Sequence, residues 1–281
     1  MKPLAELGLE QPVRVLYADV DGTLVGPGGS LFAAIPEGST ARGAAALAAL
    51  HEAGVQLVLV SGRTRRQMQE AARILGAAAY VAELGAFLVE RGDPDVVVPN
   101  LGAFDRESGA AGPFAAMVRS GAGAFLLDRY AGRLEPHTPW AFEGREATML
   151  LRGHLDLVEA TDALAHAGYT WLELRDNGII RRKIEGLDVA EIHAYHLVPR
   201  GVSKASAVAL HRRRHGLAPA QTAAIGDSPS DLEVAGEVGH VFLVANAAES
   251  PAGNETANAY RTLGAGGEGV AEVVEALLRP R

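Results

Sequence analysis

The chain has 281 residues, a length that favours two domains, or one domain with a large insertion, over a single small domain. Hydrophobic residues make up 48% and charged residues 21%, which is typical of a globular protein and excludes a disordered or fibrous chain. The formal net charge of −8 excludes a broad basic face for nucleic acid. Because there is no cysteine, any metal must be held by oxygen or imidazole, which favours a hard cation such as Mg²⁺.

Neither a leader nor a membrane segment is expected. Glu6 and Glu10 interrupt the region where a signal peptide needs an apolar stretch, and later apolar runs fall short of the roughly 20 residues that cross a bilayer. The sequence predicts a cytoplasmic protein that binds neither a membrane nor nucleic acid.

The first part of the chain alternates between strand and helix patterns. The predicted strands are residues 13–20 and 55–60, and the predicted helices are residues 41–53 and 64–75. Buried strands that alternate with helices indicate a parallel sheet that binds ligands beyond the carboxyl ends of its strands.

From about residue 86 the pattern changes to short strands and longer helical stretches, which predicts an α+β insertion. Its expected strands are residues 86–89, 96–98, 148–152, 169–174 and 179–184, and its expected helices are residues 114–130 and 155–167. After Glu191 the first pattern returns, with helices at 203–215 and 269–278 and strands at 222–225 and 241–244. We therefore predict an α/β fold with a Rossmann-like core formed by residues 1–86 and 191–281, and an inserted domain at 87–190.

Four polar clusters lie at ends of predicted strands or at starts of predicted helices. They are Asp19 and Asp21 with Gly22, Ser61 with Gly62, Lys204, and Asp227 with Asp231. An Asp–Gly pair alone is equally well explained as a turn, and the last two aspartates could simply cap a helix. Capping does not explain the matching lysine and serine elsewhere, so the pattern favours one shared site.

These clusters, in this order, resemble the four motifs of the haloacid dehalogenase (HAD) superfamily. The matching segments are DVDGTL at 19–24, SGR at 61–63, Lys204, and GDSPSD at 226–231. The long gap between the second and third motifs resembles the branch with a C2-type cap, of the C2B kind, that includes Cof-like sugar phosphatases. ELGA at 83–86, GVSK at 201–204 and NA at 246–247 are also similar to Cof-like members, although Leu84 and Ser230 replace two asparagines that are usual there.

The resemblance implies a Mg²⁺-dependent phosphatase, a phosphoric monoester hydrolase, that hydrolyses a small phosphorylated sugar or related metabolite through an aspartyl-phosphate. It implies that Asp19 is the nucleophile, that Asp21 is the general acid and base, and that Lys204 offsets negative charge. The implied phosphate-binding residues are Ser61, Gly62, Gly22 and Lys204. The implied metal-site residues are Asp19, Asp21 through its carbonyl, Asp227 and, behind them, Asp231.

Two other functions stay open. Phosphomannomutases share the motif set and the class of cap, so a phosphosugar mutase is the alternative nearest in mechanism. A sugar-phosphate sensor without turnover is the alternative from another class, and the presence of all four motif groups argues against it.

Further polar residues are weaker candidates. Arg181, Arg182, Lys183 and Asn246 could contact the substrate, although a charge run such as 181–183 is more often a solvated surface. Arg63 is either an anchor of the phosphate loop or a direct ligand. His211 and His215 have helical i, i+4 spacing but no third ligand, which favours a surface position, and His193 and His196 are expected on opposite faces of a strand.

Overall fold

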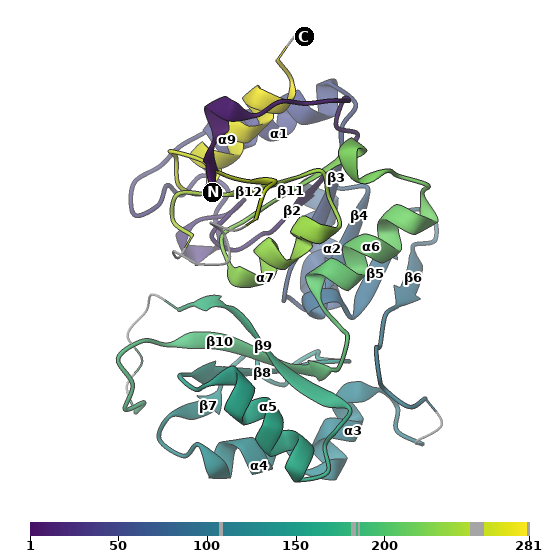
Figure 1. The fold of residues 1–281 in the computed structure, drawn as a ribbon, viewed down its shortest axis with the longest axis vertical. Coiled ribbons are helices and arrows are strands. Elements are labelled where there is room, and N and C mark those ends of the chain that lie inside the picture. Colours follow the sequence, from purple (N-terminus) through teal and green to yellow (C-terminus); the bar gives the residue numbers. More distant parts are fainter. Residues whose placement is uncertain (107–108, 181–183, 185, 248–255, 280–281) are drawn as a thin grey trace.

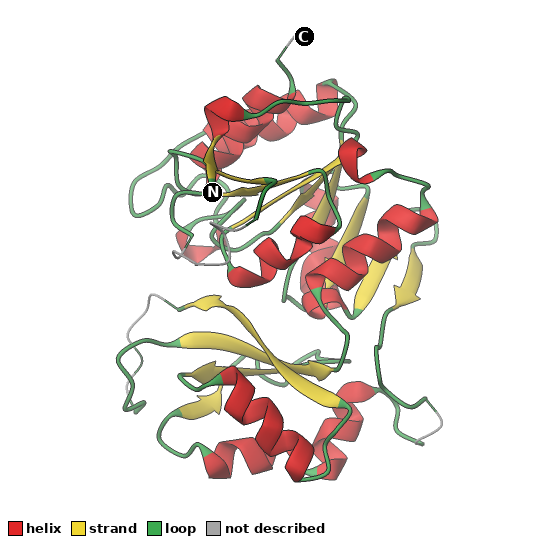
Figure 2. Cartoon of the chain, in the orientation of Figure 1, coloured by secondary structure: helices red, strands yellow, loops and turns green. Residues whose placement is uncertain are grey.

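The computed structural model describes residues 1–106, 109–180, 184, 186–247 and 256–279, and these residues form two stacked layers (Figure 1). The larger layer contains a nine-stranded sheet and the smaller a four-stranded sheet. Helices cover both faces of the larger sheet, whereas those of the smaller layer lie on the side away from the larger one (Figure 2). None of the helices in the described residues combines the length and hydropathy needed to cross a bilayer.

The nine-stranded sheet runs in the order β1-β13-β12-β11-β2-β3-β4-β5-β6. Its strands are β1 (Lys2–Pro3), β2 (Val15–Ala18), β3 (Gln56–Val60), β4 (Ala79–Ala82), β5 (Phe87–Glu90), β6 (Val96–Pro99), β11 (Thr222–Gly226), β12 (His240–Leu243) and β13 (Ala259–Arg261). Pairs from β1 to β4 are parallel, as the sequence predicts, and β4-β5 and β5-β6 are antiparallel.

Both faces of the central strands of this sheet are buried because these strands carry apolar side chains on either side. In β2, Leu16 packs into the cluster below α1 (Arg42–Glu52), α2 (Arg65–Ile74) and α9 (Gly267–Leu277). Tyr17 packs into the opposite cluster, below α6 (Lys204–Arg214) and α7 (Pro229–Leu232). The carboxyl ends of the central strands are thereby held rigidly between two cores.

The four-stranded sheet runs in the order β7-β8-β10-β9 and is antiparallel. Its strands are β7 (Leu134–Pro136), β8 (Met149–Gly153), β9 (Leu172–Ile179) and β10 (His193–Pro199), and its helices are α3 (Pro113–Ser120), α4 (Ala122–Arg129) and α5 (Leu157–His166). Alternate residues such as Leu151, Leu174 and Leu197 pack against the helices in a third core. We call this layer the cap and the larger one the core.

The strands divide between the sheets differently from the sequence expectation. β5 and β6 extend the core sheet as an antiparallel hairpin beside β4, although residues 86–89 and 96–98 were expected in the insertion. β10 joins the cap sheet, although it follows Glu191. A strand pattern shows where a strand lies in the chain but not which sheet it pairs with. The limits 1–86, 87–190 and 191–281 stay a prediction, and on this pairing we propose cap limits near residues 100 and 200.

Two expected elements of the cap also differ. The helix expected at 114–130 is two helices, because Gly121 adopts φ 79° between α3 and α4, a left-handed conformation that ends the first helix. The strand expected at 179–184 overlaps β9 only at Ile179, and residues 181–183 lie outside the described residues.

Candidate active site

Three of the predicted polar clusters lie side by side at the carboxyl ends of adjacent strands. Asp19 follows β2, Ser61 follows β3 and Asp227 follows β11, and the sheet order places β2 between the other two. Parallel pairing directs all three chain ends to one edge of the sheet, where ligands bind in open α/β sheets.

The fourth cluster, Lys204, reaches this edge from the start of α6. The Ser203 hydroxyl caps the helix by accepting a hydrogen bond from the Ser206 amide, so the lysine occupies the first turn. Its Nζ donates to Asp19 Oδ1 at 2.8 Å and to Asp231 Oδ1 at 2.7 Å. Since only 1% of the Lys204 side chain is exposed, this ammonium is a buried bridge between two carboxylates.

Asp231 is fixed on its other side by the turn that precedes it. Its Oδ2 accepts hydrogen bonds from the Ser228 amide at 3.1 Å and the Ser228 hydroxyl at 2.6 Å. Ser230, which replaces a usual asparagine of the resembled motif, lies 2.8 Å from the Ser228 hydroxyl and donates to Asn177 Oδ1 in the cap at 3.2 Å. The Asp231 carboxylate is therefore held between Lys204 and Ser228.

The charges of this site are not balanced by protein groups alone. One carboxylate oxygen each from Asp19, Asp227 and Asp231 lies within 4.8 Å of the others. Burial raises the pKa of Asp19 well above its ordinary value, with the negative charges of Asp231 and Asp227 adding to this and Lys204 opposing it. Burial alone lowers the Lys204 pKa, but attraction to Asp19 and Asp231 outweighs it and raises that pKa. The carboxylates outnumber the lysine, so a further cation would stabilise the site.

The turn after Asp19 brings the backbone close to Asp227. Gly22 has φ +82°, and a Cβ there would overlap the Asp227 carboxylate, so only glycine fits. Asn246, predicted to contact substrate, lies behind this turn: its Nδ2 donates to Gly22 O at 2.9 Å and to Asp227 Oδ2 at 3.2 Å. In this arrangement Asn246 orients the groups around the site.

Asp21 lies apart from the three buried carboxylates. Its side chain is 58% exposed and is bound bidentately by Arg63, whose Nε and Nη2 donate at 2.8 and 2.6 Å. In the structure the Arg63 guanidinium holds the side chain of Asp21, and its two predicted roles at the phosphate loop stay predictions.

Glu83 connects the core to the cap and was not singled out for this in the sequence. It is fully buried, and its carboxylate accepts hydrogen bonds from the backbone amides of residues 146, 147 and 148 and from the Thr148 hydroxyl. Its φ of 49° places it in a left-handed turn, η3 (Glu83–Gly85). The ELGA segment was the available signal, but its partners lie more than sixty residues away.

Three further cap residues lie over the Ser61-Gly62 loop. Arg145 Nη1 donates to Gly62 O at 2.7 Å. A Cβ on Gly62 would lie 2.6 Å from His196 Nε2 and 3.0 Å from Asn177 Nδ2, so both side chains press on this loop. Burial lowers the pKa of His196 well below its ordinary value, and Arg145, Lys204 and His137 lower it further. A neutral imidazole therefore faces the loop, whereas Arg181, Arg182 and Lys183 lie outside the described residues.

Solved structures of known proteins share this fold. A Thermoplasma acidophilum protein matches with a TM-score of 0.63 and 17% identity, covering 95% of this chain and 99% of that one. A haloacid dehalogenase-like hydrolase from Bacteroides thetaiotaomicron matches with a TM-score of 0.63 and 17% identity, covering 95% and 100%. The sucrose-phosphatase of Synechocystis, solved with sucrose and phosphate, matches with a TM-score of 0.62 and 16% identity, covering 95% and 98%. The fold is thus an α/β core with a cap, as predicted, and the haloacid dehalogenase-like hydrolase from Bacteroides thetaiotaomicron shares it.

Sequence comparison leads to the same family. A family model for haloacid dehalogenase-like hydrolases matches residues 182–259. A curated phosphoglycolate phosphatase from Methanoculleus marisnigri is 26% identical over 236 residues, which cover 84% of this chain and 85% of that protein. Residues 182–259 thus resemble the haloacid dehalogenase-like hydrolases, and the predicted resemblance is confirmed. The predicted class of enzyme, a phosphoric monoester hydrolase, agrees with the name of this relative.

Proposed function

We propose that the chain is a Mg²⁺-dependent phosphatase that hydrolyses a small phosphorylated sugar or related metabolite through an aspartyl-phosphate intermediate. The observation that carries the proposal is the buried Asp19 carboxylate at the end of β2, paired with Lys204 and crowded by two further carboxylates. Phosphoryl transfer needs a positioned nucleophile and cations that offset charge on the phosphate. Asp19 supplies the nucleophile, Lys204 supplies one cation, and a metal would supply the other.

The donor set fits Mg²⁺. The available groups are carboxylate and carbonyl oxygens, which are the ligands that this hard cation prefers. Because Lys204 and Ser228 already occupy both oxygens of Asp231, we assign Asp19, Asp227 and the Asp21 carbonyl to the metal, and Asp231 to holding Lys204. When bound, Mg²⁺ would offset negative charge on the phosphate and on these carboxylates.

The chain's own groups complete two displacements. An Asp19 carboxylate oxygen attacks phosphorus while the bond from phosphorus to the sugar oxygen breaks, and Asp21 gives its proton to that leaving oxygen. Asp21 then takes a proton from water as the water oxygen attacks phosphorus, which releases inorganic phosphate and frees Asp19. For Asp21 to carry this proton, one of the two hydrogen bonds from Arg63 must open, because the bidentate pair stabilises the ionised carboxylate.

The cap supports a small substrate. Arg145 and His196 lie directly over the Ser61-Gly62 loop, where the Ser61 hydroxyl and the Gly62 and Gly22 amides would bind phosphate oxygens. Cap side chains at this distance narrow the space above the loop, which favours a small substrate over a macromolecule. The names of the relatives, which mention phosphoglycolate and sucrose with phosphate, support substrates of this size.

A phosphate-release screen tests the proposal. The purified chain is assayed with Mg²⁺ on phosphorylated sugars, disaccharide phosphates, phosphoglycerate glycosides and phosphoglycolate. We expect release from at least one compound, loss of release in EDTA and recovery on adding Mg²⁺. Asp19→Asn should lower release by about 10³-fold or more, whereas Asp128→Asn, on an exposed residue of α4, should leave it unchanged.

Two results would overturn the proposal. If a folded Asp19→Asn variant still releases phosphate, Asp19 is not the nucleophile. Isomerisation of a sugar phosphate that needs an activating bisphosphate and releases no net phosphate would identify a mutase instead.

A further inference from the structure

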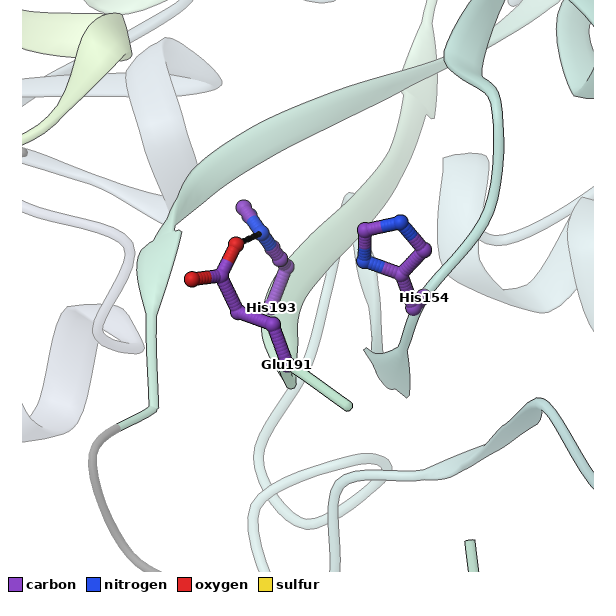
Figure 3. Close-up of side chains that lie close together, drawn as sticks. All are labelled: His154, Glu191 and His193. Atoms are coloured by element: carbon purple, nitrogen blue, oxygen red, sulfur yellow. Dashed lines mark hydrogen bonds and ion pairs between the residues drawn. The ribbon is translucent and has the colours of Figure 1, made fainter. Parts of the chain in front are cut away.

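A second cluster of metal-binding side chains lies in the cap, at the corner where β8 ends and β10 begins. His154 follows β8, Glu191 precedes β10, and His193 is the first residue of β10 (Figure 3). One ligand atom of each residue lies within 4.8 Å of the others. His193 Nε2 and Glu191 Oε1 are 2.8 Å apart, and the His154 and His193 ring centroids are 5.5 Å apart.

We propose that His154, Glu191 and His193 bind a divalent transition metal, with Zn²⁺ as the cation of choice. Two imidazoles and one carboxylate form a ligand set typical of zinc, with a fourth position left for water. Mg²⁺ prefers oxygen ligands and is a poor fit for this mixed set. The site is separate from the carboxylates of the core in both position and chemistry.

The distances need only a small adjustment. Ligand atoms of a tetrahedral zinc site lie about 3.3 Å apart, so a spacing of up to 4.8 Å closes when side chains move by about 1 Å. His154 and Glu191 are exposed and can turn at little cost, and a cation can reach them from solvent. His193 is the fixed member, since only 16% of its side chain is exposed.

The surroundings of His193 provide an independent observation that points to a metal. Its Nδ1 lies 2.7 Å from Asp176 Oδ2, and Asp176 is itself held by the Gly178 amide at 2.7 Å. The ring also stacks on Tyr195, with an interplanar angle of 9°. Histidines that bind metals commonly give their second ring nitrogen to a carboxylate, which fixes the ring and directs the other nitrogen at the metal. Here Nε2 is directed at Glu191.

Metal binding at this site would displace one proton. Without metal, a proton bridges His193 Nε2 and Glu191 Oε1, between two groups that both act as acceptors when deprotonated. The metal takes the place of this proton, which leaves to solvent, and His154 adds a further nitrogen ligand.

A metal at this corner would act as a staple within the cap. It would tie the end of β8 to the segment that enters β10, which lie far apart along the chain. Asp176 also precedes Asn177, whose side chain contacts Ser230 on the core. Fixing this end of β9 therefore steadies a residue that presses on the Ser61-Gly62 loop.

Direct Zn²⁺ binding tests the site. Full-length chain without a polyhistidine tag is titrated with Zn²⁺ in competition with a chromophoric chelator, with Mg²⁺ in excess to occupy the carboxylates of the core. We expect the tightest class of Zn²⁺ sites to weaken about 100-fold in His154→Ala and His193→Ala, and about tenfold in Asp176→Asn. His166→Ala, which removes an exposed histidine of α5, should change nothing.

A second measurement separates this site from the core. Asp227→Asn should leave the tightest Zn²⁺ class intact, and Zn²⁺ should raise the unfolding temperature of the wild type but not of His193→Ala. The proposal is overturned if His154→Ala and His193→Ala, folded as judged by circular dichroism, bind Zn²⁺ as tightly as the wild type. It is also overturned if Asp227→Asn removes the tightest class.

Discussion

The core and the cap each gather groups that can hold a cation, but in opposite surroundings. In the core, Asp19 and Asp231 are buried, and Lys204, itself buried, bridges them. In the cap, His154 and Glu191 are exposed, and His193 is mostly buried and paired with Asp176. Burial makes each charge in the core depend on the others, because an unpaired charge there is costly. In the cap, each exposed ligand can be lost without unfolding the corner.

Removal of Lys204 should have the largest effect and tests the dependence of the core charges. Lys204→Met leaves Asp19 and Asp231 buried without their shared cation. We expect a loss of about 3–5 kcal/mol in the free energy of unfolding, measured by urea titration in EDTA, and a fall of about 10²- to 10³-fold in phosphate release. Lys2→Met at the edge of the sheet is the control and should lose less than about 0.5 kcal/mol. An unchanged midpoint in Lys204→Met would contradict the buried pairing.

Metal-dependent stability separates the two regions directly. At a concentration 100 times the dissociation constant, a bound cation should stabilise the chain by about 2.7 kcal/mol. We expect Asp227→Asn to lose the stabilisation by Mg²⁺ and keep that by Zn²⁺, and His193→Ala to do the reverse. Calorimetric unfolding with each metal measures both. A single variant that removes both effects would mean that the regions are one cation site.

The contact between the core and the cap should contribute less to the free energy of unfolding than either cation site. Glu83→Gln weakens a fully buried acceptor of three cap amides and should cost about 1–3 kcal/mol. The matched control, Glu146→Gln, removes the exposed ion pair with Arg65 at the same contact and should cost less than about 1 kcal/mol. Hydrogen exchange at residues 146–148 should speed up in the first variant only. Equal exchange in both would show that Glu83 does not hold the cap.

The smallest expected effect is the pH dependence of stability that comes from His211, a buried imidazole of the core that contrasts with the exposed His154. His211 is 2% exposed and shares a hydrogen bond with the Tyr17 hydroxyl at 2.8 Å, so the predicted surface position is wrong. Burial lowers the pKa of His211 to about 4, with His215 and Arg214 lowering it and Glu90 raising it. The unfolded imidazole takes up a proton below about pH 6.5 whereas the folded one does not. The stability that His211 contributes is therefore complete above pH 6.5 and falls as the pH drops towards 4.

This dependence is measured by urea unfolding at pH 7.5 and pH 5.5. The wild type should lose about 1 kcal/mol more than His211→Gln between these two values. Identical losses in the two proteins would show that His211 does not titrate in this window.

The sequence was most informative where local pattern and chain order determine position. Asp19, Ser61 and Asp227 each end a strand of a parallel sheet, so their gathering at one edge could be predicted without knowing any long-range contact. Lys204 could be placed because Ser203 signals a helix start.

Positions set by pairing between distant segments were not predictable in this way. Nothing local assigns β5 to the core sheet or β10 to the cap sheet. The approach of His196 to Gly62, and of His154 to His193, depends on how the cap folds and docks. Arg145 carried no motif at all, yet it binds the carbonyl of Gly62.

A bulge in β9 determines which face of the cap sheet each nearby side chain occupies. The pairing of β10 with β9 shifts between His193 and Tyr195, which face Ile179 and Asp176 respectively, so β9 has one residue more than its partner there. Consecutive side chains of a strand point to opposite faces, and here Asp176 supports His193 while Asn177 contacts the core. Deleting one residue from this stretch would reverse which face each side chain occupies. The length of β9 is thus constrained by two contacts, that of Asp176 with His193 and that of Asn177 with Ser230. Relatives that keep one of these contacts are expected to keep the same number of residues in this stretch.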